Sequence, residues 1–226
     1  MPLPFHPIDV LASGLLPLQA YEATRAATRR RMIAYRRART LEFGPCMRLQ
    51  FEDALTLRYQ VQEILRAERI ADAHAVRGEL DAYAHLLPDA SNWTATLFIE
   101  VPDAALRARS LPMLSLAAHR IHLDIDGQRI CALANEDLAF GTNARHLERP
   151  SGVHFLRFEL DSQARAAIEA GAVVTLGCDD PACPLRQPMP APLLQLLRAR
   201  FGPDHDIGPA PVNPPSSRRP LERIVT

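Results

Sequence analysis

Asp126-Gly127 is the feature that most restricts the fold, because it predicts a tight turn between two strand-like segments. Both residues tolerate the positive φ angles of a type I′ turn, which joins antiparallel strands through two loop residues. Arg120–Ile125 precedes the turn and Gln128–Leu133 follows it. The expected opposing pairs are Leu123 with Ile130, Asp124 with Arg129, and His122 with Cys131. At least one antiparallel strand pair is therefore expected.

The rest of the chain alternates between helical and strand-like patterns. Further strands are expected at 46–51, 93–101, 153–160 and 172–178. Helices are expected at about 18–39, 54–70, 71–86, 103–118 and 161–170, the second of them capped by Asp53. This order predicts an α+β fold, in which a mixed or antiparallel sheet of about five strands is covered by helices on one face.

Proline content divides the 226-residue chain into two parts. Eleven of the 20 prolines lie from residue 181 onward, where they interrupt any long periodic element. We therefore expect a single domain over residues 1–180 and a proline-rich, partly disordered tail over residues 181–226. One short helix, Leu193–Phe201, is expected within that tail.

Charge and cysteine content exclude several classes of protein. The 26 basic and 26 acidic residues cancel, which argues against nucleic-acid binding, and no segment is apolar enough to span a membrane. All the basic residues are arginine, so a Schiff-base lysine and a P-loop lysine are both excluded. The N-terminus lacks the pattern of a secretory signal, and four cysteines are too few for a disulfide scaffold. A cytoplasmic protein with reduced thiols is expected.

Three segments carry a resemblance to a known family. They are GPCMRLQFEDALTLRYQVQEILRAERI (44–70), PDASNWTATLFIEV (88–101) and VHFLRFEL (153–160). They resemble a bacterial family known only as a domain of unknown function, over about residues 9–180. The resemblance implies no established reaction. Because such genes often lie beside those for rubrerythrin-like proteins and iron–sulphur oxidoreductases, it implies a redox setting and a partner of one of these kinds.

The first long helix, 18–39, has two contrasting faces. At about 100° per residue, alanines gather on one side, which suits close packing against another element. They are Ala20, Ala23, Ala27, Ala34 and Ala38. Arg25, Arg29 and Arg36 form a stripe on the opposite side, and Tyr21 and Met32 flank it.

The arginine stripe has two interpretations. Guanidinium groups suit carboxylate or phosphate recognition, so the stripe could clamp a small anion. The favoured alternative is pairing with carboxylates at 52, 53, 63 and 68 on or beside the next helix, where Glu68 lies in the apolar stripe and so needs a partner. The candidate binding residues on both helices are Arg25, Arg29, Arg36, Glu63, Arg66 and Glu68.

Other chemically capable residues have weaker patterns. Cys178 and Cys183 are spaced C-x₄-C, which alone cannot complete a metal shell, so free thiols are the favoured interpretation and no metal or cofactor is expected. Residues 135–137 and 179–180 carry acidic groups that are typical of solvated connections. His122 and His154 are expected to be partly buried with backbone partners, rather than to act as catalytic bases.

Two functional hypotheses remain. The first is an accessory or binding protein of a redox system, which docks through the two arginine- and glutamate-rich helices. The second is a small-anion-binding enzyme or sensor that uses the arginine clamp. Because the sequence has no nucleophile elbow, phosphate loop, zinc-protease motif or dinucleotide fingerprint, it leaves open whether the protein is an enzyme.

Overall fold

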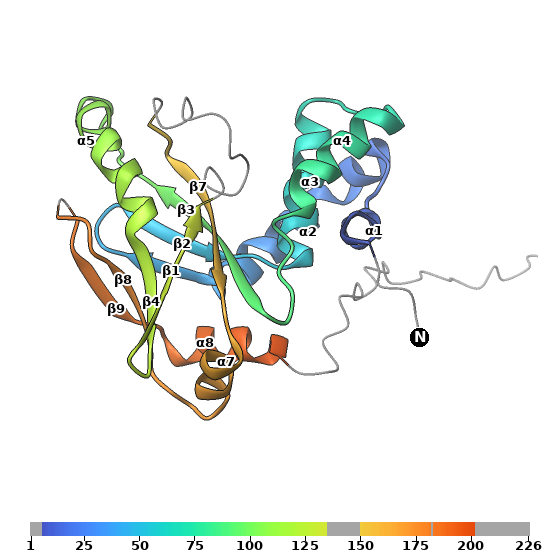
Figure 1. Ribbon diagram of the computed structural model, residues 1–226. Coiled ribbons are helices and arrows are strands. Elements are labelled where there is room, and N and C mark those ends of the chain that lie inside the picture. Colours follow the sequence, from blue (N-terminus) through green and yellow to red (C-terminus); the bar gives the residue numbers. More distant parts are fainter. Residues whose placement is uncertain (1–5, 135–149, 182, 202–226) are drawn as a thin grey trace, which may run out of the picture.

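The computed structural model describes residues 6–134, 150–181 and 183–201. These residues form two β-sheets, one of five strands and one of four, with helices on their outer sides (Figure 1). Every strand pairing in this part of the chain is antiparallel. The structure confirms the expected α+β class, but it divides the strands between two sheets.

Each sheet combines strands from distant parts of the chain. The five-stranded sheet has the order β1 (Thr40–Phe43), β2 (Met47–Phe51), β3 (Asn92–Ile99), β7 (Val153–Glu159) and β6 (Leu133–Ala134). The four-stranded sheet has the order β5 (Gln128–Cys131), β4 (Ile121–Ile125), β8 (Val174–Cys178) and β9 (Leu185–Pro188). Sequence patterns missed β1, β6 and β9, because each has four residues or fewer and, unlike β5, none follows an Asp-Gly hairpin turn.

The β4–β5 hairpin has the expected register. His122 lies opposite Cys131. The φ angles of Asp126 and Gly127 are 47° and 80°, as a type I′ turn requires. Two turn residues therefore specify the pairing of a whole hairpin.

The chain passes from one sheet to the other where β5 continues into β6. Ala132 N–H donates to the Ile121 carbonyl at 2.8 Å, which extends the pairing with β4. β6 then pairs with β7. The inward side chains of both sheets share one apolar core, whose fully buried members include Trp93, Phe51 and Phe158. This core supports the outer helical layer.

Four helices lie together on one side of the sheets (Figure 1). They are α1 (Pro7–Ala12), α2 (Leu18–Arg37), α3 (Ala54–Ala67) and α4 (Ala73–Ala84). Asp53 caps α3 by accepting hydrogen bonds from the N–H groups of Leu55 and Thr56. A second apolar cluster joins α1, α3 and α4 to Phe155 of β7. The helical layer is therefore packed on the outer face of the five-stranded sheet.

The remaining helices cover other parts of the two sheets. They are α5 (Ala104–Ala117), η1 (Ala118–Arg120), α7 (Ser162–Glu169), α8 (Ala191–Arg198) and η3 (Ala199–Phe201). Asp103 caps α5 and Asp161 caps α7. Within the described ranges, no helix combines the length and apolarity needed to cross a membrane.

The fold extends beyond the boundary expected at residue 180. β9 pairs with β8, and Leu193 and Leu197 of α8 are buried in the main core. Phe201 stacks on Trp93 with 5.8 Å between ring centroids. The expectation of a separate tail from residue 181 is corrected, because apolar residues spaced at helical intervals outweigh the local prolines. Residues 202–226 lie outside the described part.

Candidate functional site

Helix α2 packs through its arginine-bearing side. Tyr21 and Met32 are its two buried residues, and they lie on the side that carries Arg25 and Arg36. The five alanines expected to pack are all exposed. That expectation was wrong, because a tyrosine and a methionine remove far more apolar surface from water than alanines do.

A partly buried ion pair between Arg25 and Glu63 holds the N-terminal half of α2 to α3. Arg25 Nε and Nη2 donate to the two oxygens of Glu63 at 2.9 and 2.8 Å, and Tyr21 Oη donates to Glu63 at 2.5 Å. The hydrogen bond from Arg25 is the largest cause that lowers the pKa of Glu63. Burial, followed by the hydrogen bond to Glu63, raises the pKa of Tyr21. Glu63 is therefore a carboxylate fixed between two donors.

Arg66 joins the same group of charges. It lies 3.5 Å from a carboxylate oxygen of Glu63 and 3.7 Å from one of Glu22 on α2. Three of the six candidate residues, Arg25, Glu63 and Arg66, are thus brought together. The pairing of α2 with α3 is confirmed for Arg25.

Arg36 is hydrogen-bonded to a buried polar network instead of to Glu63. Its Nε donates to the Gln50 side chain, and Gln50 Nε2 donates to Glu52 at 2.8 Å. Glu52 is 1% exposed, and the same oxygen accepts from Thr96 at 2.6 Å and Gln60 at 3.0 Å. Burial raises the pKa of Glu52. Arg36 is therefore committed to a structural network.

Asp53 anchors the C-terminal end of α2. Its Oδ2 accepts from Tyr35 at 2.6 Å and from Arg39 at 2.8 Å, and lies 3.4 Å from Arg200. Burial alone would raise the pKa of Asp53, but the charges of Arg200 and Arg39 and the hydrogen bond from Tyr35 outweigh it and lower the pKa. Asp53 is one of the expected partners of the arginine stripe, but its contacts with Tyr35, Arg39 and Arg200 follow from no local sequence pattern.

Glu68 does not occupy the buried position expected for it. α3 ends at Ala67, and Glu68 is an exposed C-cap. Arg69 then adopts φ 56°, and Ile70 N–H bonds the Leu65 carbonyl at 2.8 Å, which closes the helix. The expected burial was wrong because the helical period no longer applies where the chain turns.

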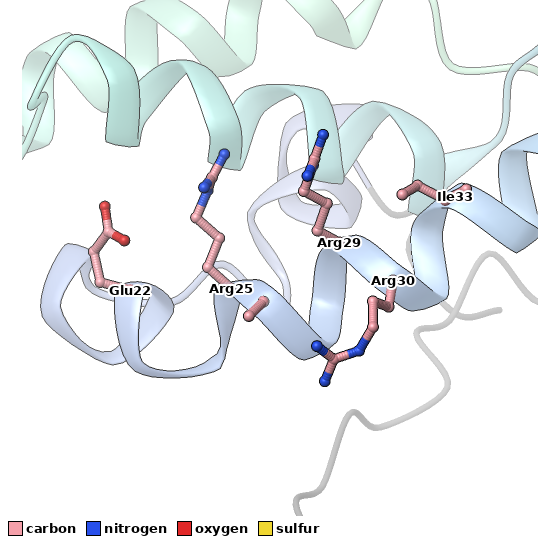
Figure 2. A pocket seen from close by; sticks show the side chains of 6 residues that line it. Glu22, Arg25, Arg29, Arg30 and Ile33 are labelled. Carbon is pink, nitrogen blue, oxygen red and sulfur yellow. The ribbon is translucent and has the colours of Figure 1, made fainter.

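Arg29 completes the six candidate residues, and its environment differs from the others. It is exposed, and it forms no hydrogen bond or ion pair with any part of the chain that the structure describes. Figure 2 shows Arg25 and Arg29 pointing from α2 toward α3, while Arg30 points away from α3. Arg30, Arg31 and Arg37 are also exposed and likewise lack partners.

A shallow hollow of about 360 Å³ lies along this flank of α2 (Figure 2). Its lining residues are Glu22, Arg25, Ala26, Arg29, Arg30 and Ile33. Ile33 is 58% exposed. The hollow therefore combines the small and apolar Ala26 and Ile33 with Arg29 and Arg30, which have no partner in the described chain.

A second group of charges lies on the outer face of the four-stranded sheet. Asp124 accepts from Arg129 at 3.1 Å and pairs with Arg186 at 2.7 Å. Arg129 also pairs with Asp179. His122 is 2% exposed, with Nε2 3.4 Å from Asp124, and its ring lies against Gly177. These groups link β4 to the neighbouring β5 and, across β8, to β9.

His122, His154 and Cys178 are buried and lie close to backbone carbonyl groups. The His122 ring lies 3.3 Å from the Arg120 carbonyl and the His154 ring 3.1 Å from the Ser151 carbonyl, which confirms buried histidines with backbone partners. Cys178 is buried and lies 3.6 Å from the Ala117 carbonyl, whereas Cys183 is partly buried. Among the described residues no group of three or more potential ligands is arranged to hold a metal. Residues 135–137 lie outside the described ranges.

The fold and these contacts define an α+β domain in which a helical layer is joined to a two-sheet core by arginine–carboxylate contacts. The chain belongs to the family described as Protein of unknown function (DUF3501), whose model matches residues 9–201. That match ends where the described core ends.

A solved structure is also similar to this chain. It is described as a novel protein of unknown function from Burkholderia pseudomallei K96243, and it is 36% identical. The similarity covers 84% of this chain and 98% of that one, with a TM-score of 0.78. No curated protein shows detectable similarity to the chain.

Proposed function

We propose that the protein is an accessory binding protein that docks an acidic partner protein on the exposed flank of α2. The observation that carries the proposal is the contrast among the arginines of this helix. Arg25 and Arg36 are bonded inward, whereas Arg29, Arg30, Arg31 and Arg37 are exposed without partners in the described chain. Unpaired guanidinium groups on a rigid helix are suited to bind carboxylates.

The charge balance supports an acidic partner. α2 carries six arginines and one glutamate, within a chain whose basic and acidic residues cancel. The positive field is thus local to this helix, and it would steer an acidic surface toward it. Two copies of α2 facing each other would repel, which argues against self-association through this helix.

The resemblance of the sequence supports a redox setting. It implies an iron–sulphur oxidoreductase or a rubrerythrin-like protein as the partner, and the proposal takes these as the two to test. A cytoplasmic location belongs to the same proposal, because the cysteine content is typical of a reducing compartment.

Affinity capture from the native host tests the proposal. The wild-type chain should retain an oxidoreductase or rubrerythrin-like protein in comparable molar amounts, and R29E/R30E should retain at least tenfold less. R77E/R109E is the matched control, because it reverses two exposed arginines on α4 and α5. Failure of the purified candidates to bind, or equal retention by R29E/R30E and the control, would refute the proposal.

A small-anion site is the second candidate function, and the surroundings of Tyr59 favour it. Burial and then Glu63 raise the pKa of Tyr59, and the charges of Arg36, Arg25 and Arg29 oppose this rise. A clamp would nevertheless need Arg25 and Arg36 to exchange their present partners for the anion.

Thermal-shift measurements with phosphorylated and carboxylated metabolites test this second function. A site built on Arg29 predicts a higher melting temperature that Arg29→Ala abolishes. No shift with any anion, or a shift unchanged in Arg29→Ala, would eliminate it.

A further inference from the structure

The hollow on α2 has the spacing of a helix-packing stripe. Ala26 and Ile33 are seven residues apart, so they lie nearly in line, two turns apart on one flank of the helix. Arg29 and Arg30 lie between them along the sequence, and Figure 2 shows their side chains directed to opposite sides. The stripe thus has apolar groups along its middle and a charge on each side.

Arg29 and Arg30 contribute to both the apolar part and the charged part of this surface. The methylene stem of an arginine covers apolar surface while its guanidinium group stays in water. Arg29 and Arg30 have no partner in the described chain, and Arg25 at the edge of the hollow is neutralised by Glu63. Two positive charges therefore remain free for a ligand that also supplies an apolar group.

A phosphate backbone would use only part of this surface. It would bind the two arginines, but it would leave Ile33 uncovered. A helix with apolar side chains one heptad apart, and with carboxylates at the positions that face Arg29 and Arg30, complements both the apolar groups and the two free charges.

We propose that this hollow binds an acidic amphipathic helix of the partner protein. Apolar side chains of the partner lie on Ala26 and Ile33, and its carboxylates pair with Arg29 and Arg30. This inference rests on the proposed docking function and specifies what the partner must present.

Binding of synthetic helical peptides to the full chain tests the inference, with fluorescence anisotropy as the readout. The probe peptide has leucines seven residues apart flanked by glutamates, and a second peptide replaces both leucines by serine. The leucine peptide should bind at least tenfold more tightly than the serine peptide. Ile33→Ser should reduce that difference to less than threefold, and R29E/R30E should weaken both peptides.

Ile33→Ser replaces an exposed residue, so a melting temperature equal to that of the wild type should accompany it. Equal affinity for the leucine and serine peptides would overturn the inference, and so would absence of binding by either one. Neither result would affect the capture experiment, which tests docking of an acidic partner independently of the apolar contacts. R77E/R109E should bind both peptides as the wild type does.

Discussion

The outer face of the four-stranded sheet and the flank of α2 both carry exposed arginines, but they use them differently. On the sheet, Arg129 of β5 and Arg186 of β9 both reach Asp124 of β4, and Arg129 also reaches Asp179, which follows β8. On α2, Arg29 and Arg30 reach no carboxylate of the described chain. The paired arginines of this sheet therefore link its strands, whereas the unpaired arginines of α2 remain available for an external ligand.

Helix α2 can present unpaired charges because its other side is well anchored. Tyr21 and Met32 are buried, Arg25 is held by Glu63, and Tyr35 and Arg39 are held by Asp53. Those contacts offset the repulsion between neighbouring arginines, which costs a few tenths of a kcal/mol per pair at helical spacing. The contacts of Asp53 with Tyr35 and Arg39 are the part of this anchor whose loss is tested first.

Removal of the anchor should have the largest effect. Asp53→Ala removes the cap of α3 and leaves the partly buried Arg39 and the buried Arg200 without their shared carboxylate. We expect a loss of about 3 kcal/mol or more in the free energy of unfolding, measured by urea denaturation.

The control for this prediction is Asp72→Ala, because Asp72 caps α4 at an exposed site and has no arginine partner in the described chain. It should cost about 1 kcal/mol. Equal losses in the two variants would mean that Asp53 acts as an ordinary cap and does not anchor α2.

Gly177→Ala should destabilise the four-stranded sheet. A Cβ atom at this position would lie 2.3 Å from His122 Nε2, so the ring would have to move and the ion pairs around it would be disturbed. We expect a loss of about 1–3 kcal/mol, measured by thermal or urea unfolding. Gly78→Ala, in α4 with nothing within 4 Å, should instead stabilise by roughly 0.5–1 kcal/mol. Unchanged stability of Gly177→Ala would show that the ring moves freely.

Charge reversal at one arginine of each region should have unequal effects on stability. Arg129→Glu places a carboxylate beside Asp124 and Asp179, and we expect it to lower the free energy of unfolding by about 1–2 kcal/mol. Arg30→Glu should change it by less than about 0.5 kcal/mol, because no contact in the described chain is lost. Similar losses in both variants would remove the distinction between the two regions.

The smallest predicted effect is a pH dependence at Asp124. Burial raises its pKa, but the hydrogen bond from Arg129 and the charges of His122, Arg129 and Arg186 outweigh burial, so the net shift is downward. A lowered folded-state pKa contributes stability above the unfolded value, near 4, and this contribution is lost as pH falls through the folded value. Asp124→Asn should therefore cost up to about 1 kcal/mol at pH 7, and less as pH falls from about 5 to 3. A cost independent of pH in urea titrations would contradict this.

Local patterns predicted much of the fold. The long helices and the β4–β5 hairpin were anticipated because caps, helical period and turn chemistry act over a few residues. The pairing of Arg25 with a carboxylate of the next helix was also anticipated, since adjacent helices with opposite charges tend to pack together. The short strands and the contribution of residues 185–201 were not, because each depends on partners far along the chain.

The candidate site was predicted less completely than the fold. Arg25, Glu63 and Arg66 come together as expected, but Glu68 is exposed and Arg36 bonds Gln50. The Asp53 cluster includes Arg200 of η3, which also donates to the Glu52 carbonyl from 148 residues away. No local sequence pattern encodes a contact at that separation.

Local residue patterns specify the antiparallel hairpin at Asp126-Gly127, the helical identity of α2 and the concentration of arginines on it. Packing against the rest of the fold selects which of those arginines are bonded inward and which face solvent. Turn and helix formation depend on neighbouring residues, whereas the orientation of an amphipathic helix depends on the total burial and charge pairing that its two faces can find. In α2, the tyrosine, methionine and Glu63 contacts outweigh the alanine face and leave Arg29 and Arg30 exposed.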